Sequence, residues 1–218
     1  MRAAARGASG EAAAAGGGTS LSLIGLSTSE QQVAKVLNQQ LTHMPEMASF
    51  MTDSTLSRVV KDIGLKPGQT YQAGYLRNQT LGWIAEQRGM KVLERAGYQV
   101  VESKLPGNKG FDAAGIRRTA AGEIQDIMIV ESKFSADGAV KLARYKGGRG
   151  GHYQQMSDEW MRSVLDRMGR SKNPKLIELS DTLEANKNLI RRQLNVLSEK
   201  GHVNWIGSKL PKTKEYKS

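Results

Sequence analysis

The stretch GEIQDIMIVESKFSADG, residues 122–138, joins the most apolar run of the chain to an acid and a base. The four apolar residues 127–130 predict a buried strand, because short apolar runs bounded by turn residues are typical of strands in a core. Glu131 and Lys133 follow directly. Residues two apart on a strand point to the same face, so we expect these two side chains to project together.

The pattern Glu-x-Lys is weak evidence when taken alone. It occurs three times, beginning at Glu102, Glu131 and Glu215, and about one copy is expected by chance in a chain of this length. The copy at Glu131 differs because Asp112 lies on the preceding predicted strand, directly after the loop GNKG. If these strands pair antiparallel through the turn TAAGE, Asp112 comes beside Glu131. Two adjacent carboxylates favour a hard cation such as Mg²⁺ or Mn²⁺ between them.

The surrounding pattern predicts an α/β (α+β) fold with a small central mixed sheet flanked by helices. Helical spacing, caps and glycine stops indicate helices over 29–44, 55–65, 72–97, 157–169 and 181–200. Strand signals cover 98–103, 111–118, 123–134 and 202–207.

Shifts in composition divide the chain into four expected parts. Ala and Gly supply 13 of the first 18 residues, which is typical of a flexible linker. We assign this linker to residues 1–28, a helical preface to 29–70, the core to 71–170, and a basic helix-and-strand extension to 171–218.

The charge and the residue types narrow the function. The formal net charge is +11, which favours a polyanionic partner, nucleic acid before a membrane surface. The chain has no cysteine and three histidines without close spacing, so a bound metal is expected on oxygen ligands. It has no apolar run long enough to span a membrane and no apolar segment of a secretory signal.

Glu86 is a further candidate, on the predicted helix 72–97. At 3.6 residues per turn, Trp83, Met90 and Leu93 fall on its side of the helix. A carboxylate in this position either lies at the edge of the apolar stripe or points into a site. The expected neighbourhood of Asp112 and Glu131 favours the second interpretation.

In order, Glu86, GFD (110–112) and VESK (130–133) resemble the PD-(D/E)xK nuclease superfamily, which has a restriction-endonuclease-like core. The motifs GNKGFD, IVESKF and QMSDEW (155–160) resemble the nuclease domains of bacterial polymorphic toxins, including interbacterial DNase effectors and contact-dependent inhibition toxins. The resemblance covers roughly residues 74–168. It departs from the family name at Phe111, which stands where that name has proline.

The resemblance implies metal-dependent hydrolysis of phosphodiester bonds in DNA. Glu86, Asp112 and Glu131 would hold Mg²⁺, with Mn²⁺ as an alternative. Lys133 would position the attacking water or stabilise charge in the transition state. Gln155 would orient the nucleophile or the scissile phosphate. Trp160, by its helical spacing, is expected in the core rather than in the site.

Five basic residues near these motifs are candidate nucleic-acid contacts, and they surround the glycine-rich segment KGGRGG: Lys109, Lys141, Arg144, Lys146 and Arg149. A solvated charged face is an equally good interpretation of them. His152 fits a solvated loop histidine better than a general base.

Three alternatives remain open at this point: an RNase toxin of the same fold, a non-catalytic DNA-binding module, and a cellular repair nuclease. The toxin resemblance further implies an acidic immunity protein as partner. It also implies delivery from the producing bacterium by a larger secreted toxin or secretion apparatus, with action in the cytoplasm of a target cell.

Overall fold

A computed structural model describes residues 21, 23–41, 53–106, 109–135, 140–146, 152–198 and 203–206. Most of the expected linker, and Arg149 with its glycine-rich loop, lie outside these ranges. The helices are α1 (Thr28–Leu41), α2 (Asp53–Asp62), α3 (Ala73–Arg95), α4 (Asp158–Gly169), α5 (Pro174–Ala185) and the 3₁₀ helix η3 (Lys187–Leu189). The strands are β1 (Gln99–Val101), β2 (Lys104–Leu105), β3 (Lys109–Gly110), β4 (Ala113–Arg118), β5 (Ile124–Ser135), β6 (Arg144–Lys146), β7 (His152–Gln154), β8 (Ile190–Ser198) and β9 (Val203–Ile206).

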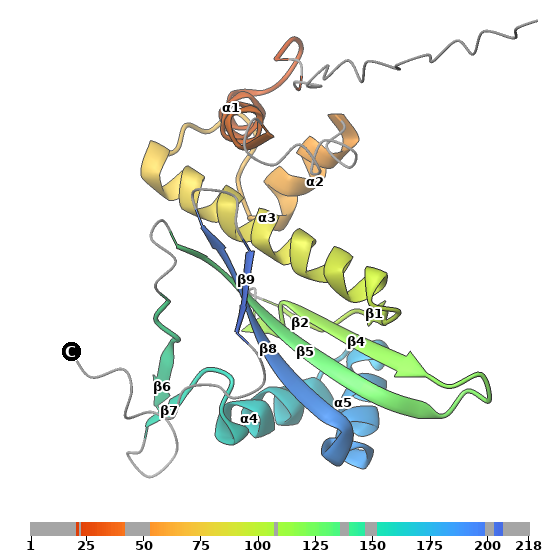
Figure 1. The fold of residues 1–218 in the computed structure, drawn as a ribbon. Helices are drawn as coiled ribbons and strands as arrows, with labels where there is room; N and C mark the ends of the chain where they lie inside the picture. Colours follow the sequence, from red (N-terminus) through yellow and green to blue (C-terminus); the bar gives the residue numbers. More distant parts are fainter. Residues whose placement is uncertain are drawn as a thin grey trace, which may run out of the picture.

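The centre of the molecule is a mixed sheet of five strands in the order β1-β4-β5-β8-β9. Strand β5 pairs antiparallel with β4 and parallel with β8, whereas the two outer pairs are antiparallel. Figure 1 shows α3 on one face of this sheet, with α4 and α5 on the other. The mixed α/β architecture expected from the sequence is therefore confirmed.

The apolar run of β5 is buried on both faces. Ile127 and Ile129 pack with residues of α4 and α5, whereas Met128 and Val130 pack toward α3. Alternation of this kind is the geometry of a pleated strand between two helical layers, and it explains why the run is continuously apolar. The same pleat fixes the direction of the residues that follow it.

The C-terminal prediction is wrong in part. A helix was expected over 181–200, but α5 ends at Ala185 and Ile190–Ser198 forms β8. The helix begins earlier because the side chain of Asn173 accepts a hydrogen bond from the backbone N–H of Lys175, with proline next in the chain. The apolar spacing after Ala185 suits either structure, and burial between β5 and β9 selects the strand.

This strand also changes the expected domain boundary. A core ending at residue 170 would cut through the central sheet, because β8 is the parallel neighbour of β5 and β9 pairs with β8. The residues after 170 therefore complete the core rather than extend it. The expected terminal strand is confirmed as β9.

The helices expected within residues 29–70 are present as α1 and α2. Their apolar faces share a core with the first half of α3 and with Leu197 of β8. Gly97, at φ +81°, ends α3 in the left-handed conformation that glycine adopts most readily. None of the helices in the described part is both long and apolar enough to cross a membrane.

The segment after β5 contains a hairpin that the sequence analysis did not predict. Strands β6 and β7 pair antiparallel and bracket the undescribed residues 147–151. His152, expected in a solvated loop, lies on β7 opposite Lys146 and is exposed.

Candidate functional site

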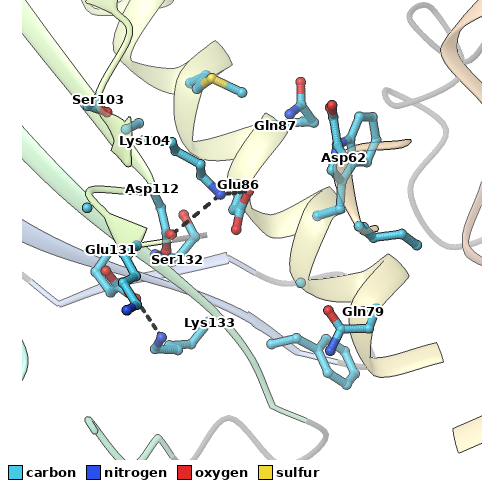
Figure 2. Close-up of a pocket in the computed structure, with 18 of the residues that line it drawn as sticks. Asp62, Gln79, Glu86, Gln87, Ser103, Lys104, Asp112, Glu131, Ser132 and Lys133 are labelled. Atoms are coloured by element: carbon cyan, nitrogen blue, oxygen red, sulfur yellow. Dashed lines mark hydrogen bonds and ion pairs between the residues drawn. The ribbon is translucent and has the colours of Figure 1, made fainter. Parts of the chain in front are cut away.

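A cleft of about 1590 Å³ lies between α3 and the end of the apolar run of β5. Its lining includes all five residues that the sequence singled out for catalysis: Glu86, Asp112, Glu131, Lys133 and Gln155. Figure 2 shows four of them, from α3, the start of β4 and β5, converging on one space. Sites for small ligands occupy roughly 300–1,000 Å³, so this cleft is large enough for a polymeric substrate.

Asp112 lies beside Glu131, as expected from the pairing of β4 with β5. The register places Ala113 opposite Val130, which brings the residues before and after that pair together. Oδ2 of Asp112 accepts a hydrogen bond of 2.8 Å from the backbone N–H of Ser132. The carboxylate of Asp112 is therefore held at the edge of β5.

Glu131 is the most deeply buried acid of the cleft, with 2% of its surface exposed. Its Oε1 accepts hydrogen bonds of 2.5 Å from Nζ of Lys133 and from Nε2 of Gln155. Its Oε2 is buried and has no hydrogen-bond partner among the described residues. Burial, reinforced by the negative charge of Asp112, raises the pKa of Glu131 to about 8.

Lys133 shares the face of Glu131, as the spacing of two residues predicted. Burial alone would lower the pKa of its ammonium group, but the charge of Glu131 and the hydrogen bond to it raise that pKa above the ordinary value. Lys133 is thus a charged donor at neutral pH, held next to the buried carboxylate.

Glu86 faces the same space from α3. Nζ of Lys104 lies 2.5 Å from Oε2 of Glu86 and 3.9 Å from Oδ1 of Asp112. Burial and the charge of Asp112 raise the pKa of Glu86 to about 7, although Lys104 acts in the opposite direction. Of the two positions considered for Glu86, the structure shows the one in which the side chain faces the cleft.

The sequence analysis missed Lys104. This lysine belongs to the Glu-x-Lys copy at Glu102, which was set aside for lack of a partner. The short hairpin of β2 and β3 pairs Lys104 with Gly110 and so carries the lysine to Asp112. A Cβ at Gly110 would lie 2.5 Å from the backbone oxygen of Ser103, and its φ is +95°, so the hairpin requires glycine there. The glycines of GNKG were the feature of the sequence from which this hairpin could have been predicted.

Asn195 of β8 is a second residue that the sequence analysis missed. Its Nδ2 donates to the backbone oxygen of Ala85 at 3.0 Å and to Oγ of Ser132 at 3.3 Å. A Cβ on Gly89 of α3 would lie 2.9 Å from that same Oγ, so the helix approaches the sheet closely here. Together these contacts hold α3 close to the sheet and so set the distance between Glu86 and β5.

Gln155 reaches Glu131 from the turn that precedes α4. Its backbone N–H donates to the oxygen of Ala143 at 2.8 Å, and Oγ of Ser157 caps α4 by accepting from the N–H of Trp160 at 3.2 Å. Trp160 is buried, and its ring meets the ring of Phe111 edge-on at 5.5 Å. Trp160 therefore belongs to the core, as predicted, although it also contributes to the lining of the cleft.

Of the four expected nucleic-acid contacts that the structure describes, only one lines the cleft. Lys109 is exposed on β3 and lines it. Lys141, Arg144 and Lys146 are exposed but are not among its lining residues, and Arg149 lies outside the described part of the chain.

Two acids of the cleft, Asp112 and Glu131, are suited to bind a divalent cation, whereas a set of three acids within the residues that the structure describes is not already arranged to do so. Among the described residues, no three acidic or histidine side chains are arranged to hold a metal ion as they stand. Asp112 and Glu131 nevertheless offer adjacent hard oxygens, and Oε2 of Glu131 lacks a protein partner in the described part. The raised pKa of Glu131 indicates how poorly its negative charge is compensated by the protein alone.

Comparisons of the chain with protein-family models, with curated protein sequences and with solved structures return no match. The geometry of the cleft and the resemblance of its motifs are therefore the grounds for inferring a function.

Proposed function

We propose that the chain is a metal-dependent nuclease with a restriction-endonuclease-like core that hydrolyses phosphodiester bonds of DNA. The observation that carries the proposal is the convergence of Glu86, Asp112, Glu131, Lys133 and Gln155 in one cleft. These residues are spread over 70 positions of the sequence and come from α3, from β5 and from the segments before β4 and α4, yet the resemblance named them together. Clusters of acids with shifted pKa values in a cleft are typical of catalytic sites.

Asp112 and Glu131 would hold Mg²⁺ or Mn²⁺, and Glu86 would bind it directly or through water. The ion would supply activation of a water molecule and neutralise charge on the phosphate. Oε2 of Glu131 is the oxygen best suited to this contact, because Lys133 and Gln155 already occupy Oε1.

The remaining polar side chains act on the water and the phosphate. Nζ of Lys133 is a charged donor that stabilises negative charge on the phosphoryl oxygens, because it lies at the cleft wall beside Glu131. The amide of Gln155 keeps Glu131 in place and orients the nucleophile. Lys104, on the opposite side of Asp112, adds a second positive charge facing the scissile phosphate.

The charge of the chain supports a nucleic-acid substrate. A net charge of +11 attracts a polyanion, and Lys109 at the rim of the cleft is placed to contact its backbone. DNA is preferred over RNA on the motif resemblance, and an RNase of the same fold is the competing function.

Parallel digestion of supercoiled DNA and of total RNA tests the proposal. The purified chain is incubated with each substrate in Mg²⁺, in Mn²⁺ and in EDTA. We expect cleavage of DNA that requires the divalent cation. Cleavage of RNA alone would replace the proposed substrate, and binding to DNA without cleavage at any cation concentration would leave a non-catalytic binding module.

We further propose that this activity serves as an antibacterial toxin, neutralised in the producing cell by an acidic immunity protein and delivered by a larger secreted toxin or secretion apparatus. Expression in the cytoplasm of a bacterium should then stop growth, and a Glu131→Gln variant should not. Normal growth at high levels of active enzyme would instead indicate a cellular repair nuclease.

A further inference from the structure

The cleft continues beyond the cluster of acids along α3. Its lining on this helix includes Gln79, Gly82, Trp83, Glu86 and Gln87, which lie three or four residues apart and thus form one stripe of the helix. Figure 2 shows Gln79, Glu86 and Gln87 along α3, with Asp62 of α2 beyond them. We call the part from Gln87 to Gln79 the α3 arm. At 1.5 Å per residue it extends about 10 Å from the catalytic carboxylate.

Because Gly82 has no side chain, space in the cleft remains free beside the α3 arm at this position. Glycine weakens a helix interior relative to alanine, so its presence in the middle of α3 calls for a reason. At Gly89 the reason is close packing on β5, because a Cβ there would lie 2.9 Å from Oγ of Ser132. At Gly82 a Cβ would meet no atom within 4 Å, and the space it would enter is the cleft. The protein's own packing therefore does not explain this glycine, whereas a ligand passing over the helix does.

The α3 arm presents neutral amides as well as cations. Gln79 and Gln87 carry neutral amides, and within the described residues neither amide hydrogen-bonds to the protein. Two arginines also line this part of the cleft: Arg58, which pairs with Asp62 at 3.4 Å, and Arg77, whose guanidinium lies 5.5 Å from the ring centre of Phe134. Amides offer a donor and an acceptor together, which matches the pairs of groups on base edges.

We propose that the α3 arm seats the nucleotides that flank the scissile phosphate of the DNA strand, with Gly82 leaving room for them and with Gln79 and Gln87 contacting base edges. The inference rests on the proposed nuclease function, because it places the substrate relative to Glu86. It assigns the preference for sequence around the cut to α3, while the lysines contact the backbone. Trp83 forms the wall, with its Nε1 donating to Asp62 at 3.2 Å.

Filling the α3 arm tests the proposal. In a Glu131→Gln background, which prevents cleavage, Gly82→Leu is compared with Gly74→Leu. Gly74 is the matched control because it lies on the same helix, also has no atom within 4 Å of a Cβ, and does not line the cleft. Fluorescence anisotropy with a labelled DNA duplex and with a labelled single strand, in Mg²⁺, should show binding weakened about tenfold or more for Gly82→Leu only. Equal affinities of the two leucine variants, both folded by circular dichroism, would overturn the proposal.

Sequencing of the cut ends gives the second measurement. In the active chain, Gln79→Ala and Gln87→Ala should alter the bases preferred beside the cut while cleavage continues, because a lost bidentate amide contact relaxes discrimination about tenfold. Unchanged preferences in both variants would contradict base contact by these amides. If the unaltered chain cuts no nucleic acid but loses DNA binding on Gly82→Leu, the nuclease proposal fails and the assignment of the α3 arm as a binding surface stands.

Discussion

Strand β5 carries two buried acids five residues apart, and these acids differ in how well hydrogen-bond donors surround them. Asp126 is surrounded by donors: Nε of Arg191 donates to its Oδ1 at 2.8 Å, Nη2 of Arg117 lies 3.3 Å from its Oδ2, and the hydroxyl of Tyr98 donates to the same oxygen. Glu131 has two donors on one oxygen, none from the described residues on the other, and Asp112 as a neighbour.

The pKa values follow from these surroundings. Burial alone would raise the pKa of Asp126, but the hydrogen bonds from Arg191 and Tyr98 hold it below the ordinary value. Burial dominates at Glu131, and the charge of Asp112 adds to it, so that the pKa of Glu131 rises to about 8. An acid compensated by arginines stabilises the fold, whereas an acid left short of positive charge is available for a cation and for chemistry.

Glu131→Gln should separate catalysis from stability most clearly. We expect DNA cleavage to fall about a thousandfold, because the variant loses the anionic oxygen that holds the cation while keeping the size of the side chain. Thermal unfolding should be unchanged or shifted upward, since a poorly compensated buried charge is removed. Initial rates on supercoiled DNA and calorimetric unfolding measure the two effects. A large fall in stability would place Glu131 with Asp126 as a structural acid.

The stability of the fold should depend on pH with one sign for the acids of the cleft and with the opposite sign for Asp126. The folded pKa values of Glu86 and Glu131 are raised from 4.5 to about 7 and about 8, so their contribution is fully present below about pH 4.5 and is lost as the pH rises through these values. Asp126 has a lowered pKa, so its contribution is present above its unfolded pKa and is lost as the pH falls through the folded one.

In EDTA, the free energy of unfolding should therefore decrease by several kcal/mol between pH 5 and pH 8. Mg²⁺ should reverse most of this decrease at pH 8 and have little effect at pH 5, because the cation competes with protons for the same oxygens. Urea denaturation at both pH values, with and without Mg²⁺, measures the effect. A decrease that Mg²⁺ does not change would argue against a cation at these acids.

Asp126→Ala should be the reverse of Glu131→Gln. We expect a loss of about 2 kcal/mol in the free energy of unfolding, less than for a fully buried ion pair because Arg117 and Arg191 are partly exposed. Cleavage per folded molecule should be unchanged, since Asp126 does not line the cleft. Urea denaturation and cleavage rates well below the unfolding midpoint give the two values. Lost activity in a folded variant would show coupling along β5.

Lys104 and Lys109 provide a smaller contrast within the hairpin of β2 and β3. Lys104→Met should reduce the maximal cleavage rate about tenfold, because Lys104 contacts Glu86 and lies near Asp112. Lys109→Met should leave that rate unchanged, weaken DNA binding, and reduce the slope of log affinity against log salt by about one. Rates and affinities at several salt concentrations distinguish them. Equal behaviour of the two variants would show that Lys104 contributes only general charge.

The central part of the site could be predicted because it depends on local pattern. Strands β4 and β5 are joined by a short turn, so their pairing follows from neighbouring residues, and Asp112 is carried to Glu131 by that pairing alone. The two-residue period of a strand then places Lys133 beside Glu131. Glu86 could be proposed only together with Asp112 and Glu131, because its position on the apolar stripe fits the edge of the stripe equally well.

The rest depends on contacts between distant residues. Strand β8 was predicted as helix because Leu194 and Leu197 fit a helical stripe, and only burial beside β5 selects the extended form. Asn195 and Lys104 were missed for a related reason. Asn195 lies on Ile190–Ser198, which pairs with β5, and Lys104 pairs with Gly110. Neither pairing can be recognised from a local period of the sequence.

The account depends most directly on whether phosphodiester cleavage requires a divalent cation at the Glu131 cluster. The decisive measurement is a time course of supercoiled DNA with the purified chain in Mg²⁺, after addition of EDTA, and after excess Mg²⁺ is restored. We predict that nicked and linear DNA accumulate in Mg²⁺, that EDTA stops their formation, and that restored Mg²⁺ resumes it. Intact DNA throughout with a folded protein in Mg²⁺ or Mn²⁺, or cleavage that continues in EDTA, would contradict the account.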